Sequence, residues 1–328
     1  MFRRPARSDR LPPATEPGRI RERGRANRAR PPSGRSCNHD RVSTEQPTLR
    51  WISLDGAANA RAVVPGVLLR ADNLQSLTRR DVRHLADDQR VELVLDLRTD
   101  VEVELEGPGP LAREPGIRIE HRSLYPDSGG NTDLEVDTVK PWRRAHDEGM
   151  EEEQPIVRAY VSYLRRRPDS VVGSIRSIAR ADSAVLVHCA AGKDRTGVVV
   201  AVALAAAGVG HEAIVADYLA SAERIEAIMA RLVSSPTYRA ELVGHDPRQH
   251  APMPGTMERF LEIVDQLHGG SAAWLQANGL EPPDLERLRI RLGPDRASGD
   301  RRGGPDPGEN SLEPGELGTE LVDQHGLG

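Results

Sequence analysis

Short apolar runs alternate with amphipathic segments through the middle of the chain. Four runs have the length and the β-branched content of strands, and they cover residues 64–69, 91–97, 117–124 and 184–188. The run 184–188 is apolar almost throughout, which is typical of a buried parallel strand. The sequence therefore predicts a sheet of at least four strands.

Apolar residues at helical spacing lie between and after these runs. They predict helices over 77–88, 156–167 and 171–181, with Pro168 ending the second. Residues 198–204 are apolar on every side, as in a buried helix. Three further apolar faces lie near the C-terminus, at 225–232, 257–267 and 285–292, and a polar break over 234–254 follows the first. The order predicts an α/β fold, a mainly parallel central sheet flanked by helices, with added C-terminal helices.

The two ends of the chain lack this periodicity. Residues 1–47 are rich in arginine and proline, and residues 294–328 are rich in glycine, proline and acidic residues. We expect both to be disordered tails, one basic and one acidic, around a single domain over 48–293. The basic tail is either a contact for nucleic acid or anionic lipid, or a solvated arm. Within the domain, residues 128–154 resemble a long surface insertion, either a functional lid or a plain loop.

Composition and charge exclude several classes of protein. The formal net charge is −5, so the chain as a whole is no basic nucleic-acid binder. No apolar run approaches the ~18 residues of a membrane span, and we expect no stable membrane anchor. The N-terminus lacks the apolar stretch of a signal peptide, which favours the cytoplasm and leaves non-standard secretion open. The two cysteines, Cys37 and Cys189, are too few for a disulfide scaffold or a cysteine-rich metal cluster.

The candidate chemistry lies in the run HCAAGKDRTG over residues 188–197. It joins the last predicted strand to the start of the buried helix, where unpaired N–H groups and the helix dipole attract anions. Cys189 is the candidate nucleophile, and we expect this surrounding to lower the pKa of its thiol well below the usual ~8.5. Arg195 can bind two phosphate oxygens at once, and Thr196 can donate a hydrogen bond to the thiolate.

The remaining loop residues complete a cradle for phosphate. Gly192 permits a turn that a side chain would block. The predicted phosphate-binding residues are Ala190, Ala191, Gly192, Lys193, Asp194, Arg195 and Thr196. The alternative, that Cys189 is a buried structural residue, does not explain why these residues follow it between a strand and a helix.

This loop resembles the H-C-x5-R-[ST]-G signature of cysteine-dependent phosphatases, and more closely the bacterial tyrosine phosphatases with an H-C-x-x-G-K-D-R-T-G loop. Two further segments are similar to motifs of the same family. One runs from Asp96-Leu97-Arg98 through Glu102 to the Gly-Pro-Gly turn at 107–109, and the other is the helix V-A-D-Y-L at 215–219. The family often opens with N-F-R-D-x-G-G, where this chain has SLDGAAN over 53–59. The resemblance implies a phosphatase fold, a phosphocysteine intermediate, no cofactor, and helices past residue 219 that can cover the site as a mobile lid.

Expulsion of the leaving group needs a proton donor, for which two aspartates compete. Asp127 follows the strand 117–124 at the edge of the sheet where the 188–197 loop also emerges, and it resembles the family's P-[FY]-P-D aspartate. Asp194 lies in the loop itself, where the resemblance implies that it organises the loop or orients the hydrolytic water. Asp96 is expected to form a structural ion pair or to anchor a loop.

Other residues bear on the substrate. Lys193 adds positive charge that suits the neighbouring phosphates of an inositol ring, or it is a plain surface lysine. His188 is expected to orient the loop or to tune Cys189, and no second ligand beside it suggests a metal. Tyr160, Tyr163 and Trp142 are candidates to flank an aromatic ring, although the two tyrosines also fit core positions.

Three functions remain open from the sequence. The first is a protein tyrosine phosphatase, and the second is the same chemistry on phosphoinositides. The third is a phosphate-binding module without turnover. A sulfurtransferase fits the Cys189–Arg195 spacing poorly. The partner is then a phosphotyrosine protein or a phosphoinositide, with no nucleic acid expected, and the sequence does not set the oligomeric state.

Overall fold

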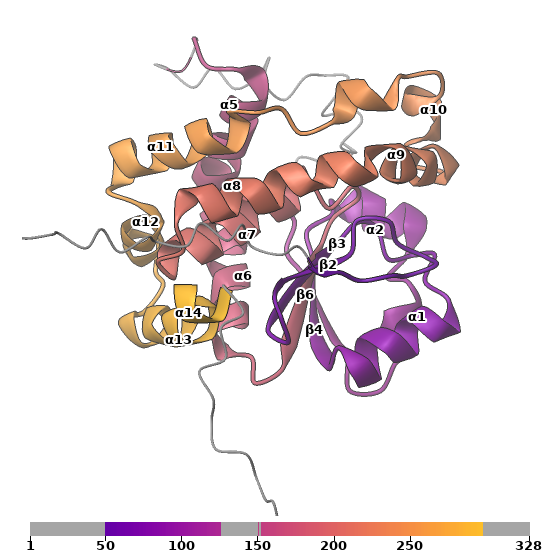
Figure 1. Ribbon diagram of the computed structural model, residues 1–328, viewed down its shortest axis with the longest axis horizontal. Helices are drawn as coiled ribbons and strands as arrows, with labels where there is room; N and C mark the ends of the chain where they lie inside the picture. Colours follow the sequence, from indigo (N-terminus) through magenta and orange to yellow (C-terminus); the bar gives the residue numbers. More distant parts are fainter. Residues whose placement is uncertain (1–49, 126–149, 151, 298–328) are drawn as a thin grey trace, which may run out of the picture. The chain divides into compact units, whose positions relative to one another are not determined.

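A computed structural model of the 328-residue chain describes residues 50–125, 150 and 152–297 (Figure 1). Its centre is a six-stranded sheet in the order β1-β2-β3-β6-β4-β5. The strands are β1 (Arg50–Trp51), β2 (Arg61–Val64), β3 (Leu68–Ala71), β4 (Val91–Asp96), β5 (Arg118–His121) and β6 (Ala184–His188). Strands β3, β6, β4 and β5 pair in parallel, and β1 and β2 are antiparallel additions at one edge. The predicted mainly parallel sheet is confirmed.

The predicted strand over 64–69 is wrong, because the chain turns within it. Val64 ends β2, and Leu68 begins β3, which pairs with β2 in antiparallel fashion. Pro65 has no N–H to donate to a strand partner, and Gly66 has a φ of +70°, in the left-handed region. The run is therefore a hairpin turn with the start of β3.

Helices fill most of the remaining described residues. Before β6 they are α1 (Arg79–Arg83), the π-helical η1 (His84–Asp88), α2 (Asp100–Glu106), the 3-10 turn η2 (Pro110–Arg113), α5 (Pro155–Arg166) and α6 (Pro168–Arg180). After β6 they are α7 (Asp194–Ala206), α8 (His211–Ala220), η3 (Ser221–Arg224), α9 (Ile225–Ser234), α10 (Arg239–Leu242), η4 (Pro247–His250), α11 (Thr256–His268), α12 (Ser271–Ala277), α13 (Pro282–Leu292) and α14 (Pro294–Ala297). Pro168 begins α6 at a position where its missing N–H costs nothing.

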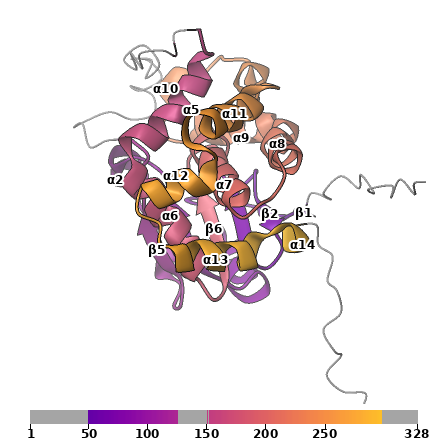
Figure 2. The ribbon, with the colours of Figure 1, turned by 90° about the vertical axis from the view of Figure 1, so that its left-hand side faces the viewer.

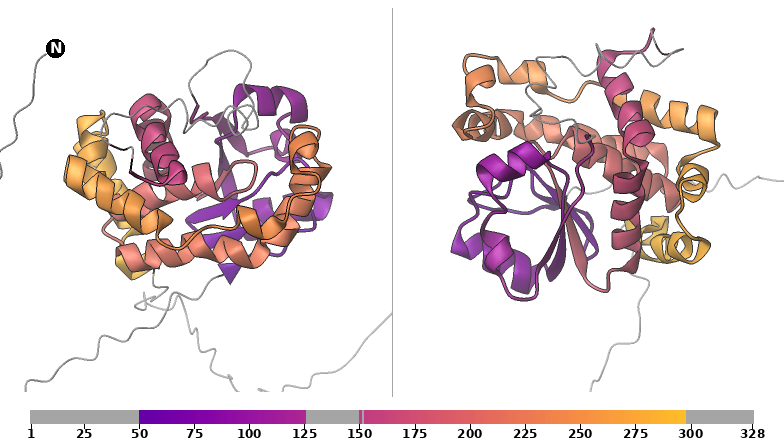
Figure 3. Two further views of the ribbon diagram at one scale, coloured as in Figure 1. Left: turned by 90° about the horizontal axis from the view of Figure 1, so that it is seen from above. Right: turned by 180° about the vertical axis from the view of Figure 1, so that it is seen from behind.

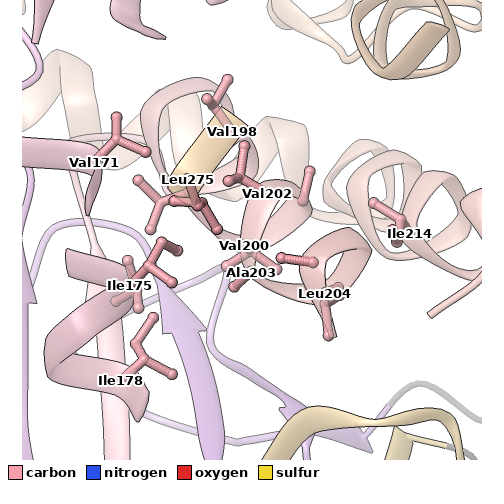
Figure 4. Close-up of a cluster of buried hydrophobic side chains, with 14 of the residues drawn as sticks. Val171, Ile175, Ile178, Val198, Val200, Val202, Ala203, Leu204, Ile214 and Leu275 are labelled. Atoms are coloured by element: carbon pink, nitrogen blue, oxygen red, sulfur yellow. The ribbon is translucent and has the colours of Figure 1, made fainter. Parts of the chain in front are cut away.

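Alternate side chains of the sheet face two different apolar layers. In β6, Val185 and Val187 join the larger core with α5, α6, α7 and the C-terminal helices, whereas Ala184 and Leu186 join a smaller core beneath α1. Figure 1 shows α1 on one side of the sheet and α6, α7 and α13 on the other, and Figure 2 is viewed from the side of α13. The close-up in Figure 4 shows the larger core, where α6 and α7 meet Leu275 of α12.

Four details of the C-terminal helices differ from the prediction. Ile290 is 63% exposed, because Leu285, Leu288 and Leu292 occupy the inner face of α13 and Ile290 lies on the opposite one. Leu267, in the last turn of α11, is 54% exposed. The polar break contains α10 and η4, and α12 has no counterpart in the prediction.

The predicted tails and insertion fall largely outside the described residues. These residues are 1–49, 126–149, 151 and 298–328, and they include Asp127, Trp142 and Cys37. The helical turn α14 continues to Ala297, a few residues past the predicted end of the domain. None of the described helices has the length and apolarity needed to span a membrane.

Candidate active site

The candidate active site lies where the carboxyl ends of the parallel strands meet. Ala71 of β3 and Asp96 of β4 both pair in register with His188, the last residue of β6. The segments that leave these strands therefore emerge side by side, as at the ligand-binding edge of other α/β sheets. Cys189 follows β6 directly and begins the predicted loop.

The loop folds tightly around the Cys189 sulfur before α7 begins at Asp194. The Gly192 N–H donates to Sγ of Cys189 at 3.2 Å. Gly192 has a φ of +65°, and a Cβ there would lie 2.3 Å from the carbonyl oxygen of Ala71. Only glycine fits, so the turn predicted at this position is present.

Three polar residues hold the loop from behind. Asn59 Nδ2 donates to the carbonyls of Ala191 and Gly192 at 3.0 and 3.2 Å, and Arg70 Nη2 donates to that of Gly192 at 2.6 Å. Because the carbonyl and the following N–H point in opposite directions across a planar peptide, the bond to the Ala191 carbonyl is consistent with the Gly192 N–H facing the sulfur. Asp217 in turn binds Arg70 and also accepts from Arg61 Nε at 2.8 Å.

Sequence reasoning missed these supporting residues. Asn59 and Arg61 lie in and just after the segment that departs from the family's usual opening, and the structure shows that this segment supports the loop. One residue in the sequence could have indicated them. Arg70 lies inside an apolar strand, and an arginine is almost never fully buried without a partner.

Arg195 lies beside Cys189 and is paired with a carboxylate. Its Nη1 and Nη2 donate to the two oxygens of Glu102 at 2.7 and 3.1 Å, and Nη1 also donates to the Leu97 carbonyl at 3.2 Å. Burial opposes the charge of Arg195, but Glu102, together with Tyr238 and Tyr125, more than offsets this effect, so the pKa of the guanidinium lies above its usual value. The sequence analysis identified Glu102 only as part of a similar motif, and it did not predict this contact.

Cys189 and Arg195 line one cavity of about 100 Å³. Its opposite side is formed by residues 225–250, hereafter the wall segment, which comprises α9, α10 and η4. The lining residues from this segment are Ile225, Ile228, Met229, Leu232, Tyr238, Leu242 and His250. Figure 1 shows α9 and α10 above the strands, and the right-hand view of Figure 3 shows the same helices from behind. Most of the wall is aliphatic, so the cavity has a charged floor and an apolar side.

Comparisons with known proteins agree with this geometry. The family profile described as "Tyrosine phosphatase family" matches residues 53–293. The chain belongs to the tyrosine phosphatase family. It is a cysteine-based phosphatase that hydrolyses phosphomonoesters.

Two curated relatives of this phosphatase cover most of its length. It is 29% identical over 273 residues to "Triple specificity protein phosphatase PtpB" of Mycobacterium tuberculosis, covering 73% of this chain and 95% of the relative. It is 30% identical over 250 residues to "Tyrosine-protein phosphatase" of Nostoc commune, covering 72% and 78%. A solved structure described as the Siw14 catalytic core matches 66% of this chain and 97% of that one, at 12% identity and a TM-score of 0.25.

The low pKa predicted for the thiol of this phosphatase is wrong for the described geometry. Cys189 is buried, and burial raises the pKa of its thiol above the usual value. The hydroxyl and backbone N–H of Thr196 lower the pKa, whereas the carboxylates of Asp194 and Glu102 raise it further. The amide cradle is present, but burial and two nearby carboxylates outweigh it.

Asp194 and Lys193 interact with each other at the start of α7. Lys193 Nζ donates to Asp194 Oδ1 at 2.8 Å, and the buried Tyr160 hydroxyl donates to the same oxygen. Tyr160 and Tyr163 are both buried, as expected of core tyrosines rather than residues flanking a substrate ring. Asp194 is thus held in place from two sides.

His188 and Asp96 form a buried pair below the loop. His188 Nε2 lies 3.6 Å from Asp96 Oδ1, and Nδ1 lies 3.3 Å from the Cys189 carbonyl oxygen. Burial lowers the pKa of His188, although Asp96 opposes this. Asp96 also binds Arg98 Nη2 at 2.7 Å, which is the structural ion pair expected there. Among the described residues, no three potential ligands of the His, Cys, Asp or Glu type are grouped to hold a metal.

Asp127 lies outside the described residues, but the chain just before it reaches the site. The Tyr125 ring lies 5.8 Å from the Arg195 guanidinium carbon, measured to the ring centroid. Tyr125 also contacts the Tyr163 hydroxyl at 2.8 Å through its own hydroxyl. Tyr125, two residues before Asp127 in the sequence, therefore lies next to Arg195.

Proposed function

We propose that this phosphatase hydrolyses phosphotyrosine in proteins, with Cys189 as the nucleophile, Arg195 as the phosphate ligand and Asp127 as the general acid. The observation that supports it most is the shared cavity of Cys189 and Arg195, charged at its base and aliphatic on its far side. Such a cavity suits a phosphate attached to an aromatic ring, because the ring can contact the aliphatic wall while the phosphate reaches the loop.

The proposed reaction has two displacements. In the first, the Cys189 thiol gives its proton to solvent water, the resulting thiolate sulfur bonds to phosphorus while the bond from phosphorus to the tyrosine oxygen breaks, and Asp127 gives its proton to that oxygen. In the second, water attacks phosphorus while the Asp127 carboxylate takes a proton from that water, the sulfur leaves as thiolate, and inorganic phosphate is released. Arg195 and the loop amides bind the equatorial oxygens in both steps. The Thr196 hydroxyl, which is buried and has no other partner among the described residues, is placed to donate to the departing thiolate.

A second substrate class, the phosphoinositides, has one observation in its favour. Lys193 lines the same cavity as Arg195 and adds positive charge where a neighbouring phosphate of an inositol ring would lie. The relative from Mycobacterium tuberculosis is named for triple specificity, which is consistent with more than one substrate class. The aliphatic wall favours the aromatic ester as the principal substrate.

A substrate panel tests the proposal. We expect phosphotyrosine peptides to be hydrolysed faster than phosphoserine peptides or any phosphoinositide, as measured by release of inorganic phosphate. Lys193→Gln should lower hydrolysis of phosphoinositides more than hydrolysis of phosphotyrosine. A faster rate on a phosphoinositide would reverse the assignment, and binding of phosphate without turnover of any ester would favour the non-catalytic module.

Replacement of Asp127 tests the general acid. We expect Asp127→Asn to slow the hydrolysis of esters with poor leaving groups, such as phenyl phosphate, by about 10²–10⁴-fold, because the leaving oxygen must be protonated as it departs. The hydrolysis of esters with good leaving groups, such as p-nitrophenyl phosphate, should slow much less. The measurement is kcat across a series of leaving-group pKa values.

Two variants serve as controls for that series. Asp133→Asn changes another aspartate of the same segment, and it should leave kcat unchanged for every ester of the series. Asp194→Asn tests the rival aspartate. If Asp194→Asn rather than Asp127→Asn steepens the dependence on leaving-group pKa, the acid is Asp194.

The proposed partners follow from the proposed chemistry. They are phosphorylated proteins that present a tyrosine to the cavity, and we propose that the enzyme meets them in the cytoplasm. The support for this location is the sequence alone.

A further inference from the structure

The orientation of the Arg195 guanidinium is set by Glu102. The pair is bidentate, with Nη1 on one carboxylate oxygen and Nη2 on the other. A guanidinium is planar and rigid, so a bond to each Nη group fixes the direction in which its Nε–Nη2 edge points. Any residue that holds the Glu102 carboxylate therefore also controls how Arg195 faces a phosphate.

Glu102 is fully buried and is held by two groups besides Arg195. The backbone N–H of Thr99 donates to Oε2 at 2.7 Å, as part of the capping box that starts α2. The Tyr238 hydroxyl donates to Oε1 and lies 3.4 Å from Arg195 Nη2. One of these donors is local in sequence, and the other comes from the wall segment, 136 residues away.

Tyr238 belongs both to the cavity and to this buried network. Its side chain is 5% exposed and lines the cavity together with Cys189 and Arg195. Burial, reinforced by Glu102, raises the pKa of Tyr238, which keeps its hydroxyl protonated and able to donate. The same segment that forms the aliphatic wall thus makes direct contact with the pair that orients the arginine.

We propose that Tyr238 is a positioning residue for Arg195, which holds the Glu102 carboxylate and through it the guanidinium, so that the wall segment in place completes the phosphate-binding site. The proposal rests on the proposed function in one respect, namely that Arg195 binds phosphate. It assigns the wall segment two tasks, contact with the substrate's apolar part and orientation of its phosphate ligand.

The test compares Tyr238→Phe with a matched control. Tyr238→Phe removes only the hydroxyl, and we expect about tenfold weaker binding of inorganic phosphate by calorimetry and a KM for aryl phosphate raised by about the same factor. We expect kcat to change by less than about threefold, because binding of substrate and of transition state weaken together. Thr237→Val is the control, since it removes a neighbouring buried hydroxyl that has no partner among the described residues. It should leave phosphate binding and KM unchanged.

A double-mutant cycle shows whether Tyr238 acts through Glu102. In a Glu102→Gln background, Tyr238→Phe should weaken phosphate binding by less than about twofold, because the carboxylate that transmits the effect is gone. An unchanged phosphate affinity in Tyr238→Phe, an equal loss in Thr237→Val, or the same tenfold loss in the Glu102→Gln background would each overturn the proposal. A wild-type enzyme that binds phosphate but does not hydrolyse phosphotyrosine would refute the proposed function. The effect of Tyr238→Phe on phosphate binding could still be measured and interpreted in that case.

Discussion

Cys189→Ser is expected to abolish hydrolysis of aryl phosphates while inorganic phosphate still binds. A serine hydroxyl ionises far less readily than a thiol, so it cannot attack phosphorus at neutral pH. Loss of a nucleophile of this kind lowers kcat by about 10⁴–10⁶-fold. Asn59 and Arg70 hold the loop through its carbonyls, and Glu102 holds Arg195, so none of these contacts depends on the sulfur and the cradle remains intact. Turnover on p-nitrophenyl phosphate and calorimetric titration with phosphate measure the two properties separately.

The chain offers a direct control for this substitution. Cys37 is the second of its two cysteines and lies far from the loop in sequence. Cys37→Ser should retain full activity, and it should still form a phosphocysteine that can be trapped by acid quenching. Residual turnover above one per cent in Cys189→Ser, or loss of activity in Cys37→Ser, would contradict the assignment of the nucleophile.

The sequence predicted the local parts of this site well. The strand 184–188, the turn at Gly192 and the start of a buried helix are encoded within a short run, where each residue's role follows from its immediate neighbours. Strand propensity likewise located β4 and β5 to within a few residues. Short-range sequence patterns predict these elements because backbone geometry alone determines how residues close in sequence are placed relative to one another.

The long-range partners of the loop could not be predicted in this way. Glu102 and Tyr238 reach Arg195 from 93 and 43 residues away, and nothing in their own surroundings reveals the contact. The prediction of a lowered thiol pKa was wrong for the same reason. The sequence shows the amides of the loop, but it does not show that Cys189 is buried or that the carboxylates of Asp194 and Glu102 lie near it. The wall segment was read as a polar break beyond residue 234, because helices as short as α10 have too few turns to show a period.

Asp217→Asn is expected to produce the largest loss of stability among single polar substitutions at the back of the loop. Asp217 binds both Arg61 and Arg70, whose side chains are 0% and 1% exposed. Removal of its charge leaves two buried guanidinium groups without their counterion, which costs about 3–5 kcal/mol of unfolding free energy. Urea denaturation at pH 7 measures this loss. Glu212→Gln, an exposed carboxylate on the same helix α8, is the control and should change stability by less than about 0.5 kcal/mol.

The pH dependence of this loss identifies its electrostatic origin. Burial raises the pKa of Asp217, but Arg61 and Arg70 together outweigh it and hold the pKa below its usual value. A carboxyl with a lowered pKa contributes its stability above the unfolded value of about 3.9, and loses it as pH falls through the folded value. The difference in unfolding free energy between the wild type and Asp217→Asn should therefore be constant from pH 7 to about 5, and should shrink as the pH falls below about 4. A difference that stayed constant down to pH 2.5 would show that the substitution acts through packing instead of charge.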